Sequence, residues 1–237
     1  MLETSDSVEP VFPAATVVLV RDGDAGLEAL LVQRNQAVQH MGGMWVFPGG
    51  KVDEADYPLD RKDYPDDRND YAAAINAAIR ETREEAGLDI RAEQLVYLSH
   101  WTTPEGAKRR FATWFFLAIL EDGQEVCVDG GEIALHRWVQ PATAIAESAD
   151  DTHPLRLMPP TYVSLADIAD CHSCALVRER IGQREALVYA PRMVGIDGGM
   201  CFLYDGDAGY DDLALETEGG RHRLYMLNNQ LEYIRQC

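Results

Sequence analysis

The chain has 237 residues, of which 46% are hydrophobic and 26% are charged, and its formal net charge is −19. This length and composition are typical of a globular protein with one enlarged domain, or one and a half. The acidic balance argues against nucleic acid as a partner, because contacts with its phosphates need a basic surface.

Residues 1–13 read as a flexible leader, and they lack the basic start of a signal peptide or a transit peptide. No apolar run approaches the roughly 18 residues that a membrane span needs. We therefore expect a soluble, cytoplasmic protein that has no membrane partner.

Apolar runs and turn residues divide the rest of the chain into strands and helices. The expected strands are 14–21, 27–34, 95–102, 111–120, 132–139, 223–227 and 230–234, and the expected helices are 71–86, a short one from Pro141, 161–171 and 175–181. The first two strands form a hairpin, and so do the last two around Asn228-Asn229, because Asn tolerates positive φ. Strand 111–120 is apolar enough to be central in a sheet.

Residues 80–88 carry the strongest functional signal, at the end of an alanine-rich helical run. Positions three and four apart are neighbours on a helix, so Glu81, Glu84 and Glu85 project from one face. Three like charges side by side repel unless something neutralises them, and a Mg²⁺ or Mn²⁺ ion explains the arrangement. The alternative is a solvated acidic helix end, which is a common surface feature.

Two segments together resemble the signature of the Nudix hydrolase family, G-x5-E-x7-R-E-U-x-E-E-x-G-U, in which U is a bulky apolar residue. The upstream segment is Phe47-Pro48-Gly49-Gly50, and the matching residues of the second are Arg80, Glu81, Glu84, Glu85, Gly87 and Leu88. The resemblance implies an α/β fold, the Nudix α/β/α sandwich with a mixed sheet, over residues 14–150. It also implies that water cleaves a diphosphate linked to another moiety, with Mg²⁺ or Mn²⁺ as cofactor.

The chain departs from the signature between its two halves. Residues 51–79 separate Gly50 from Arg80, more than twice as many as in the signature, and we expect 51–70 to form an exposed insertion loop. Ala72 stands where the family has its first glutamate, which braces the loop. The residues that could replace this glutamate are Asp53, Glu54 and Asp56.

By resemblance, Glu81, Glu84 and Glu85 hold the metal ions together with a backbone carbonyl near Gly50. Arg80 then pairs with a carboxylate and maintains the helix geometry. Glycine at position 50 agrees with this, because it allows close approach of other groups to the backbone.

The general base of the reaction is either a glutamate of the signature or one from a later loop. Glu132, which follows Asp129-Gly130-Gly131, is our first choice, and Glu125 and Glu105 are weaker candidates. The alternative role for Glu132 is a charge at a strand edge.

Three side chains are candidates for substrate binding. Arg34 and Arg110 stand at strand ends, where a guanidinium can grip phosphate oxygens with two hydrogen bonds. Trp101 is a candidate for stacking on a base, although tryptophans are more often part of the core.

Residues 30–47 also resemble the pattern L-L-T-x-R-[SA]-x3-R-x3-G-x3-F-P-G-G of coenzyme-A-type Nudix enzymes. Arg34, Gly43 and Phe47 match it, whereas Val32, Asn35 and Gln39 depart from it. The long insertion is similar to that of a coenzyme-A-cleaving subgroup found in animals. We therefore expect coenzyme A or acyl-CoA as substrate, with ADP-ribose, dinucleotides and nucleoside triphosphates as alternatives.

A non-catalytic Nudix-fold module that senses a nucleotide is the alternative from another functional class, and an inert scaffold is a third. We interpret 151–237 as a helical and β-hairpin extension packed on the core, and family resemblance makes a homodimer an open expectation. Cys171 and Cys174 suggest zinc, but no second pair stands at metal-site spacing, so free thiols are the stronger expectation.

Overall fold

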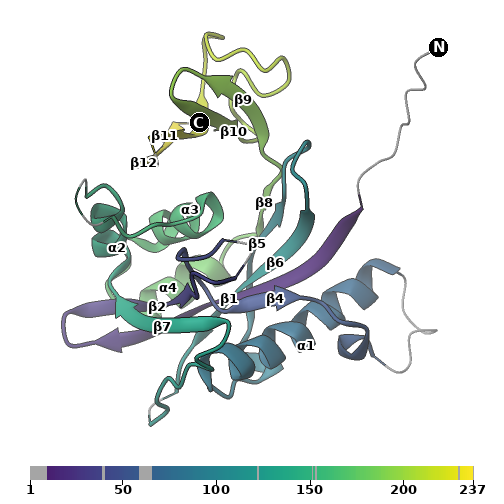
Figure 1. Cartoon of the computed structure of the whole chain (residues 1–237), viewed down its shortest axis with the longest axis vertical. Coiled ribbons are helices and arrows are strands. Elements are labelled where there is room, and N and C mark those ends of the chain that lie inside the picture. Colours follow the sequence, from purple (N-terminus) through teal and green to yellow (C-terminus); the bar gives the residue numbers. More distant parts are fainter. Residues whose placement is uncertain are drawn as a thin grey trace.

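The computed structural model of the chain describes residues 10–38, 41–58, 66–121, 123–150, 152, 154–228 and 230–236. Within these residues, eight strands form one mixed sheet and four strands form a second, antiparallel sheet (Figure 1). The strands of the main sheet are β1 (Val11–Gly23), β2 (Gly26–Arg34), β3 (Trp45–Val46), β4 (Gly49–Lys51), β5 (Val96–Thr102), β6 (Arg110–Ile119), β7 (Ile133–Val139) and β8 (Leu187–Tyr189).

The main sheet has the order β3-β2-β1-β6-β5-β8, with β4 also paired to β1 and β7 to β2. The pairs β1–β6 and β5–β8 are parallel, and the others are antiparallel. Residues 17–20 of β1 are all fully buried, as expected for a strand that is covered on both faces. The predicted central position of strand 111–120 is confirmed, because β6 lies between β1 and β5.

Helix α1 (Asp66–Ala86) covers one face of the main sheet. Its buried positions include Ala73, Ala74, Ala77 and Ala78, and this stripe of small side chains packs in one cluster with residues of β1 and β6. The helix ends at Ala86 and is followed by Gly87, whose φ of +67° suits a glycine and whose N–H donates to the carbonyl of Arg83. A short 3₁₀ turn, η1 (Glu54–Asp56), precedes α1, and another, η3 (Ala92–Gln94), follows it.

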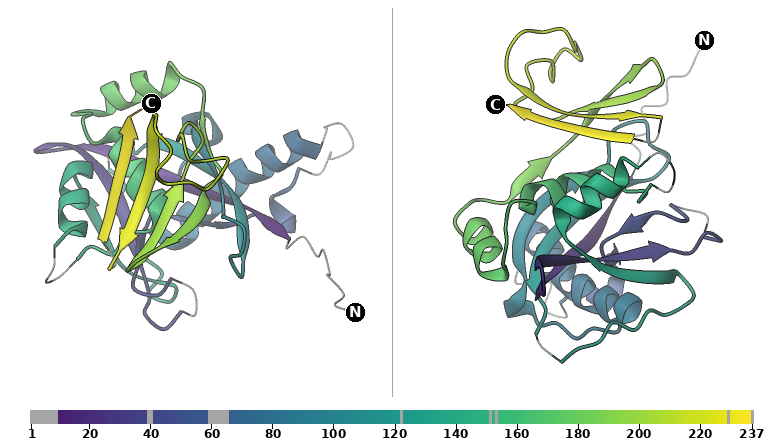
Figure 2. Two further views of the ribbon diagram at one scale, coloured as in Figure 1. Left: turned by 90° about the horizontal axis from the view of Figure 1, so that it is seen from above. Right: turned by 90° about the vertical axis from the view of Figure 1, so that its left-hand side faces the viewer.

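Helices α2 (Pro141–Ser148), α3 (Pro159–Ile168) and α4 (Cys174–Gly182) pack into the core on the opposite face. A proline in the first turn of α2 and of α3 costs no hydrogen bond, since the first N–H groups of a helix have no partner within it. The right-hand view in Figure 2 shows the blue helix α1 at the bottom, the main sheet above it, helices α2 and α3 above the sheet, and the lighter green helix α4 to the left. The predicted mixed α/β sandwich is confirmed.

The second sheet consists of β9 (Arg192–Ile196), β10 (Gly199–Leu203), β11 (Arg221–Leu227) and β12 (Gln230–Gln236), in the order β12-β11-β10-β9. It lies above the helices in the right-hand view of Figure 2. Phe202, Tyr204 and Leu224 are buried in the same cluster as α3, α4 and β5. The predicted hairpin around Asn228 is confirmed, with Leu227 opposite Gln230 and Asn228 at φ +50°. Asn229 lies outside the described residues.

Several bounds differ from those expected. β1 begins at Val11, within the segment predicted to be a leader, and α1 begins at Asp66, within the predicted insertion loop. Residues 59–65 of that loop lie outside the described residues. The extension contributes β8 to the edge of the main sheet, so its contact with the core includes backbone hydrogen bonds. No helix among the described residues is both long and apolar enough to cross a membrane.

Candidate active site

A glycine turn and the last turns of α1 meet on one side of the main sheet. β4 pairs with β1, with Gly49 opposite Thr16 and Gly50 opposite Ala15. The N–H of Gly49 donates to Oε2 of Glu85 at 2.9 Å. A Cβ atom on Gly50 would lie only 2.4 Å from Oε1 of Glu81, so the carboxylate of Glu81 occupies the space that a side chain at position 50 would take.

The three glutamates of α1 differ in how far they are exposed to solvent. Glu84 is 59% exposed, whereas Glu81 is 15% and Glu85 is 7% exposed. Burial raises the pKa of Glu85 to about 8, despite the hydrogen bond from Gly49 and the nearby charge of Arg34. Burial also raises the pKa of Glu81, against the opposing effect of Arg80.

Arg80 connects the helix to the segment that follows the glycine turn. Its Nη1 donates to Oε1 of Glu81 at 2.7 Å and to Oε2 of Glu84 at 3.1 Å. Its Nε and Nη2 donate to the two oxygens of Asp56 at 3.0 and 2.8 Å, and Nη2 also donates to the carbonyl of Lys51. These partners raise the pKa of Arg80, so its charge is permanent.

Arg34 joins the glutamate cluster to a loop far along the chain. Its Nη2 donates to Oε1 of Glu132, and its Nη1 lies 4.0 Å from Oε1 of Glu85. The charge of Glu132 contributes to the raised pKa of both Glu81 and Glu85. The fold therefore brings the predicted base beside the predicted metal ligands.

The turn at residues 129–133, which carries Glu132, is held by hydrogen bonds within the turn and from Asn35. The carboxylate of Asp129 accepts from the N–H groups of Glu132 and Ile133, both at 2.9 Å. Asn35 donates its N–H to the carbonyl of Glu132 at 2.7 Å and its Nδ2 to the carbonyl of Gly131 at 3.1 Å. Sequence reasoning did not assign roles to Asn35 and Asp129, although an Asp before Gly-Gly is a known turn signal.

Comparison with known proteins agrees with this geometry. The NUDIX domain matches residues 11–159, more than half of the chain. The chain belongs to the NUDIX family. No curated relative matches it in sequence. A NUDIX hydrolase from Alicyclobacillus acidocaldarius superposes with a TM-score of 0.61 at 22% identity, over 73% of this chain and 97% of that chain, which supports the fold.

Other solved structures align less closely. An Ap4A hydrolase from C. elegans, solved as a binary complex, has a TM-score of 0.47 at 24% identity, covering 71% of this chain and 99% of that one. The NUDIX domain of Shewanella oneidensis NrtR, complexed with ADP ribose, has a TM-score of 0.45 at 18% identity, covering 73% and 89%. The family assignment makes this chain a hydrolase of pyrophosphate bonds, and NUDIX hydrolases generally use divalent metal ions.

The donor groups around the glycine turn suit a hard divalent ion, because they are carboxylate and carbonyl oxygens. In the structure, Arg80 donates hydrogen bonds to one oxygen of Glu81 and to one oxygen of Glu84. No group of three or more His, Cys, Asp or Glu side chains in the described part of the chain is arranged to hold a metal. The cationic Nη1 nevertheless bridges two of the predicted ligands, so the space between them favours positive charge.

Two predicted substrate-binding residues lie away from the glycine turn and the three glutamates of α1. Trp101 is 4% exposed and stacks on Tyr189 at 4.0 Å between ring centroids, so it is a core residue rather than a platform for a base. Arg110 begins β6 opposite Val11, five residues along β1 from the position that pairs with Gly49, or roughly 16 Å of strand. Its Nε donates to the carbonyl of Thr103.

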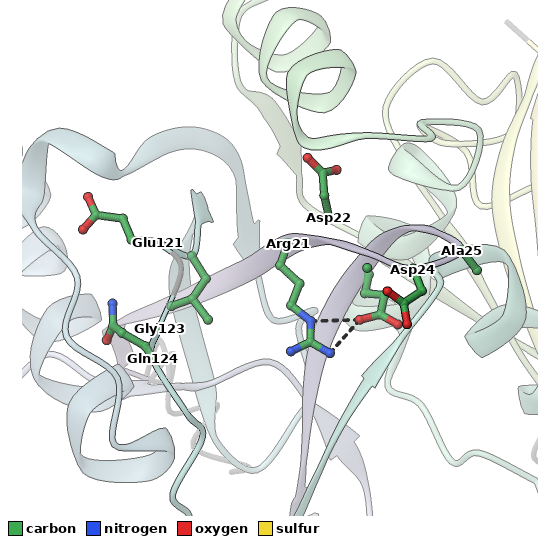
Figure 3. A pocket seen from close by; sticks show the side chains of 10 residues that line it. Arg21, Asp22, Asp24, Ala25, Glu121, Gly123 and Gln124 are labelled. Carbon is green, nitrogen blue, oxygen red and sulfur yellow. Dashed lines mark hydrogen bonds and ion pairs between the residues drawn. The ribbon is translucent and has the colours of Figure 1, made fainter.

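A pocket of about 370 Å³ lies at the far end of β1, beside the β1–β2 turn (Figure 3). Its polar lining includes the carboxylates of Asp22, Asp24 and Glu121, and Arg21 is paired with Glu28 at 2.8 Å. Its lining includes neither the glycine turn nor any of the three glutamates of α1. The pocket is therefore separate from the candidate site.

Cys171 and Cys174 are buried and are not joined in a disulfide. Burial, together with the charge of Asp22, raises the pKa of Cys174 to about 12. This disfavours the thiolate form that a zinc ligand requires.

Proposed function

We propose that the chain hydrolyses a pyrophosphate bond with Mg²⁺ or Mn²⁺ held by Glu81, Glu84 and Glu85 and by the carbonyl of Gly50. The observation that carries this proposal is the contact between the last turns of α1 and the glycine turn. Glu85 accepts the N–H of Gly49, and the carboxylate of Glu81 lies in the space that a side chain at position 50 would fill.

A divalent ion, when bound, neutralises phosphate charge and makes a water molecule more acidic. Glu132 is our proposed general base, because it lies beside the glutamate cluster and is 51% exposed, so that water reaches it. Arg34 is positioned to exchange a carboxylate oxygen for a phosphate oxygen of the substrate. Arg80 maintains the arrangement of Glu81 and Glu84.

For the substrate, we propose coenzyme A or acyl-CoA, on the similarity of residues 30–47 to the coenzyme-A pattern. A pocket of about 410 Å³ lined by Gln33, Gly43, Trp45 and Arg156 lies along the same segment, and its volume is within the usual range for a small-molecule site. ADP-ribose and dinucleotides, bound or cleaved by the more distant neighbours, are the competing substrates.

The test is a screen of the purified protein against coenzyme A, ADP-ribose, NADH and a nucleoside triphosphate, each with Mg²⁺ or Mn²⁺. We expect hydrolysis that stops when the metal is chelated, fastest on coenzyme A. Glu84→Gln and Glu85→Gln should each lower kcat at least about a hundredfold, since removal of a metal ligand costs several kcal/mol of transition-state stabilisation.

Glu93→Gln, a change to an exposed carboxylate in η3 that pairs with Arg91, is the matched control and should leave the rate unchanged. Undiminished turnover in Glu84→Gln or Glu85→Gln would contradict the proposed metal site. A faster reaction on ADP-ribose would overturn only the substrate. Negligible turnover of all four compounds would favour the nucleotide-sensing alternative.

A further inference from the structure

This chain lacks the first glutamate of the NUDIX signature. The segment between the glycine turn and α1 supplies another carboxylate in its place. At position 72, where the signature has a glutamate, the side chain is a methyl group and cannot pair with an arginine. Asp56, in η1, is 5% exposed, and its carboxylate accepts hydrogen bonds from Nε and Nη2 of Arg80 at 3.0 and 2.8 Å. Such a bidentate contact determines the orientation of the guanidinium as well as its distance.

Asp56 is itself held on both sides. The N–H of Asp53 donates to its Oδ2 at 2.8 Å, and Nδ2 of Asn76, on α1, donates to its carbonyl at 2.7 Å. One residue later, the hydroxyl of Tyr57 donates to Asp70 of α1 at 2.9 Å. These contacts attach η1 to the side of α1 over two of its turns, so the position of Asp56 is determined by the helix that it braces.

The remaining donor group of Arg80, Nη1, contacts two of the proposed metal ligands. With Nε and Nη2 directed to Asp56, Nη1 is the group that meets Glu81 and Glu84. Burial by itself would raise the pKa of Asp56, but the hydrogen bonds from Arg80 and Asp53 hold it below its ordinary value. The pair is therefore charged on both sides, which makes these hydrogen bonds strong.

Of the carboxylates that could have replaced the missing glutamate, Asp53 is the close competitor. Its Oδ2 lies 3.8 Å from Nη2 of Arg80, beyond hydrogen-bond distance, and its side chain is 66% exposed. Water therefore screens this contact, whereas the contact of Asp56 with Arg80 is sheltered.

We propose that Asp56 is a positioning residue for metal binding, which acts through Arg80 on Glu81 and Glu84. The inserted segment is then part of the active site, because it compensates for the alanine at position 72. This inference rests on the function proposed above, since it assumes that the two glutamates hold a divalent ion.

The experiment compares Asp56→Asn with the matched variant Asp53→Asn, two neighbouring changes that each remove one negative charge near Arg80. Mn²⁺ binding is titrated by electron paramagnetic resonance without substrate, and kcat, KM and the melting temperature are measured alongside. Groups that orient metal ligands typically contribute 10–100-fold to metal affinity. We expect Asp56→Asn to weaken Mn²⁺ binding by at least about tenfold and to lower kcat, with partial recovery of kcat at high Mn²⁺. Asp53→Asn should match the wild type in Mn²⁺ affinity and in kcat.

A lower melting temperature with unchanged Mn²⁺ affinity would show that Asp56 only stabilises the fold, and would overturn the inference. If Asp56→Asn does not fold, Asn76→Ala removes one hydrogen bond from the same turn and should weaken Mn²⁺ binding several-fold, and unchanged binding would again overturn it. Failure of the wild type to bind Mn²⁺ or to turn over substrate would instead reject the proposed function.

Discussion

Two arginines lie among the carboxylates around the glycine turn, in a chain whose net charge is −19. Arg80 contacts Asp56, Glu81 and Glu84, and Arg34 contacts Glu132 and lies 4.0 Å from Glu85. The two guanidinium groups offset part of the charge of these five carboxylates. A divalent ion, when bound, would offset more of it and so admit a polyphosphate substrate.

Glu132→Gln tests the base at the scale of a single residue. The amide keeps the size of the side chain but cannot accept a proton, so kcat should fall by about 10²–10⁴-fold, the range that general bases contribute. Mn²⁺ affinity without substrate should change little, because Glu132 is not among the proposed ligands. Steady-state kinetics and a Mn²⁺ titration measure the two effects.

Glu125→Gln is the comparison for that prediction, since Glu125 is an exposed glutamate seven residues earlier in the same connection. It should behave as the wild type. Should Glu125→Gln slow the reaction while Glu132→Gln does not, the base has been assigned to the wrong residue.

At the scale of elements, a buried ion pair organises the connection between β10 and β11. Arg223 and Asp207 are 2% and 0% exposed, and two of their hydrogen bonds measure 2.7 Å. The N–H groups of Gly209 and His222 also donate to Asp207, and the carbonyl of Leu215 accepts from Arg223. Because the donors and acceptors are matched, the pair determines the path of residues 204–220 over the second sheet.

Asp207→Asn should destabilise the protein by about 3–5 kcal/mol, because it leaves Arg223 buried without its counter-charge. Asp205→Asn, a change to an exposed carboxylate two residues away, should have little effect. Urea unfolding followed by fluorescence provides both free energies. A change below about 1 kcal/mol in Asp207→Asn would mean that the pair is replaced by other contacts.

The same pair predicts a pH dependence. Burial alone would raise the pKa of Asp207, but Arg223 and two backbone N–H groups lower it from 3.8 to about 2. The stabilisation is therefore fully present above pH 4 and is lost as the pH falls from 4 to 2. Unfolding free energies at pH 5, 4 and 3 should converge between the wild type and Asp207→Asn, and a constant difference would contradict this assignment.

At the scale of the whole molecule, an aromatic cluster joins the two sheets. Trp101 of β5 stacks on Tyr189 of β8 and meets Tyr204, which follows β10, edge-on at 5.8 Å. The second sheet thus packs into the same core as the main sheet, as its close position in Figure 2 suggests. We expect the two sheets to unfold together, since they share one core.

Trp101→Ala should lower stability by about 3–5 kcal/mol, the usual range for truncating a buried aromatic side chain, with one unfolding transition. KM at a temperature well below melting should be unchanged, because Trp101 lies in the core. Val188→Ala, on the neighbouring strand at a side chain that is 66% exposed, should be neutral. Calorimetry that shows two transitions, or a raised KM with normal stability, would contradict this role.

The sequence by itself determined the features that depend on local spacing. The strands at 14–21, 27–34 and 111–120 and the glutamate face of the helix are all visible in residues a few positions apart, because their periods are those of a strand and a helix. The two halves of the signature, at residues 47–50 and 80–88, were recognisable because each is a run of neighbouring residues. The two-residue and three-residue strands β3, β4 and β8 were not predicted, because they are too short to show a period.

Only the tertiary structure decided which distant segments meet. Glu132 reaches Arg34 across 98 positions of sequence, because β7 pairs with β2. Asp56, rather than Asp53, pairs with Arg80 because η1 lies against α1. Trp101 is buried because Tyr189 and Tyr204, from the C-terminal part of the chain, pack against it. The spacing of residues within one helix or strand is set by local backbone geometry, whereas these contacts depend on how the helices and sheets pack against one another.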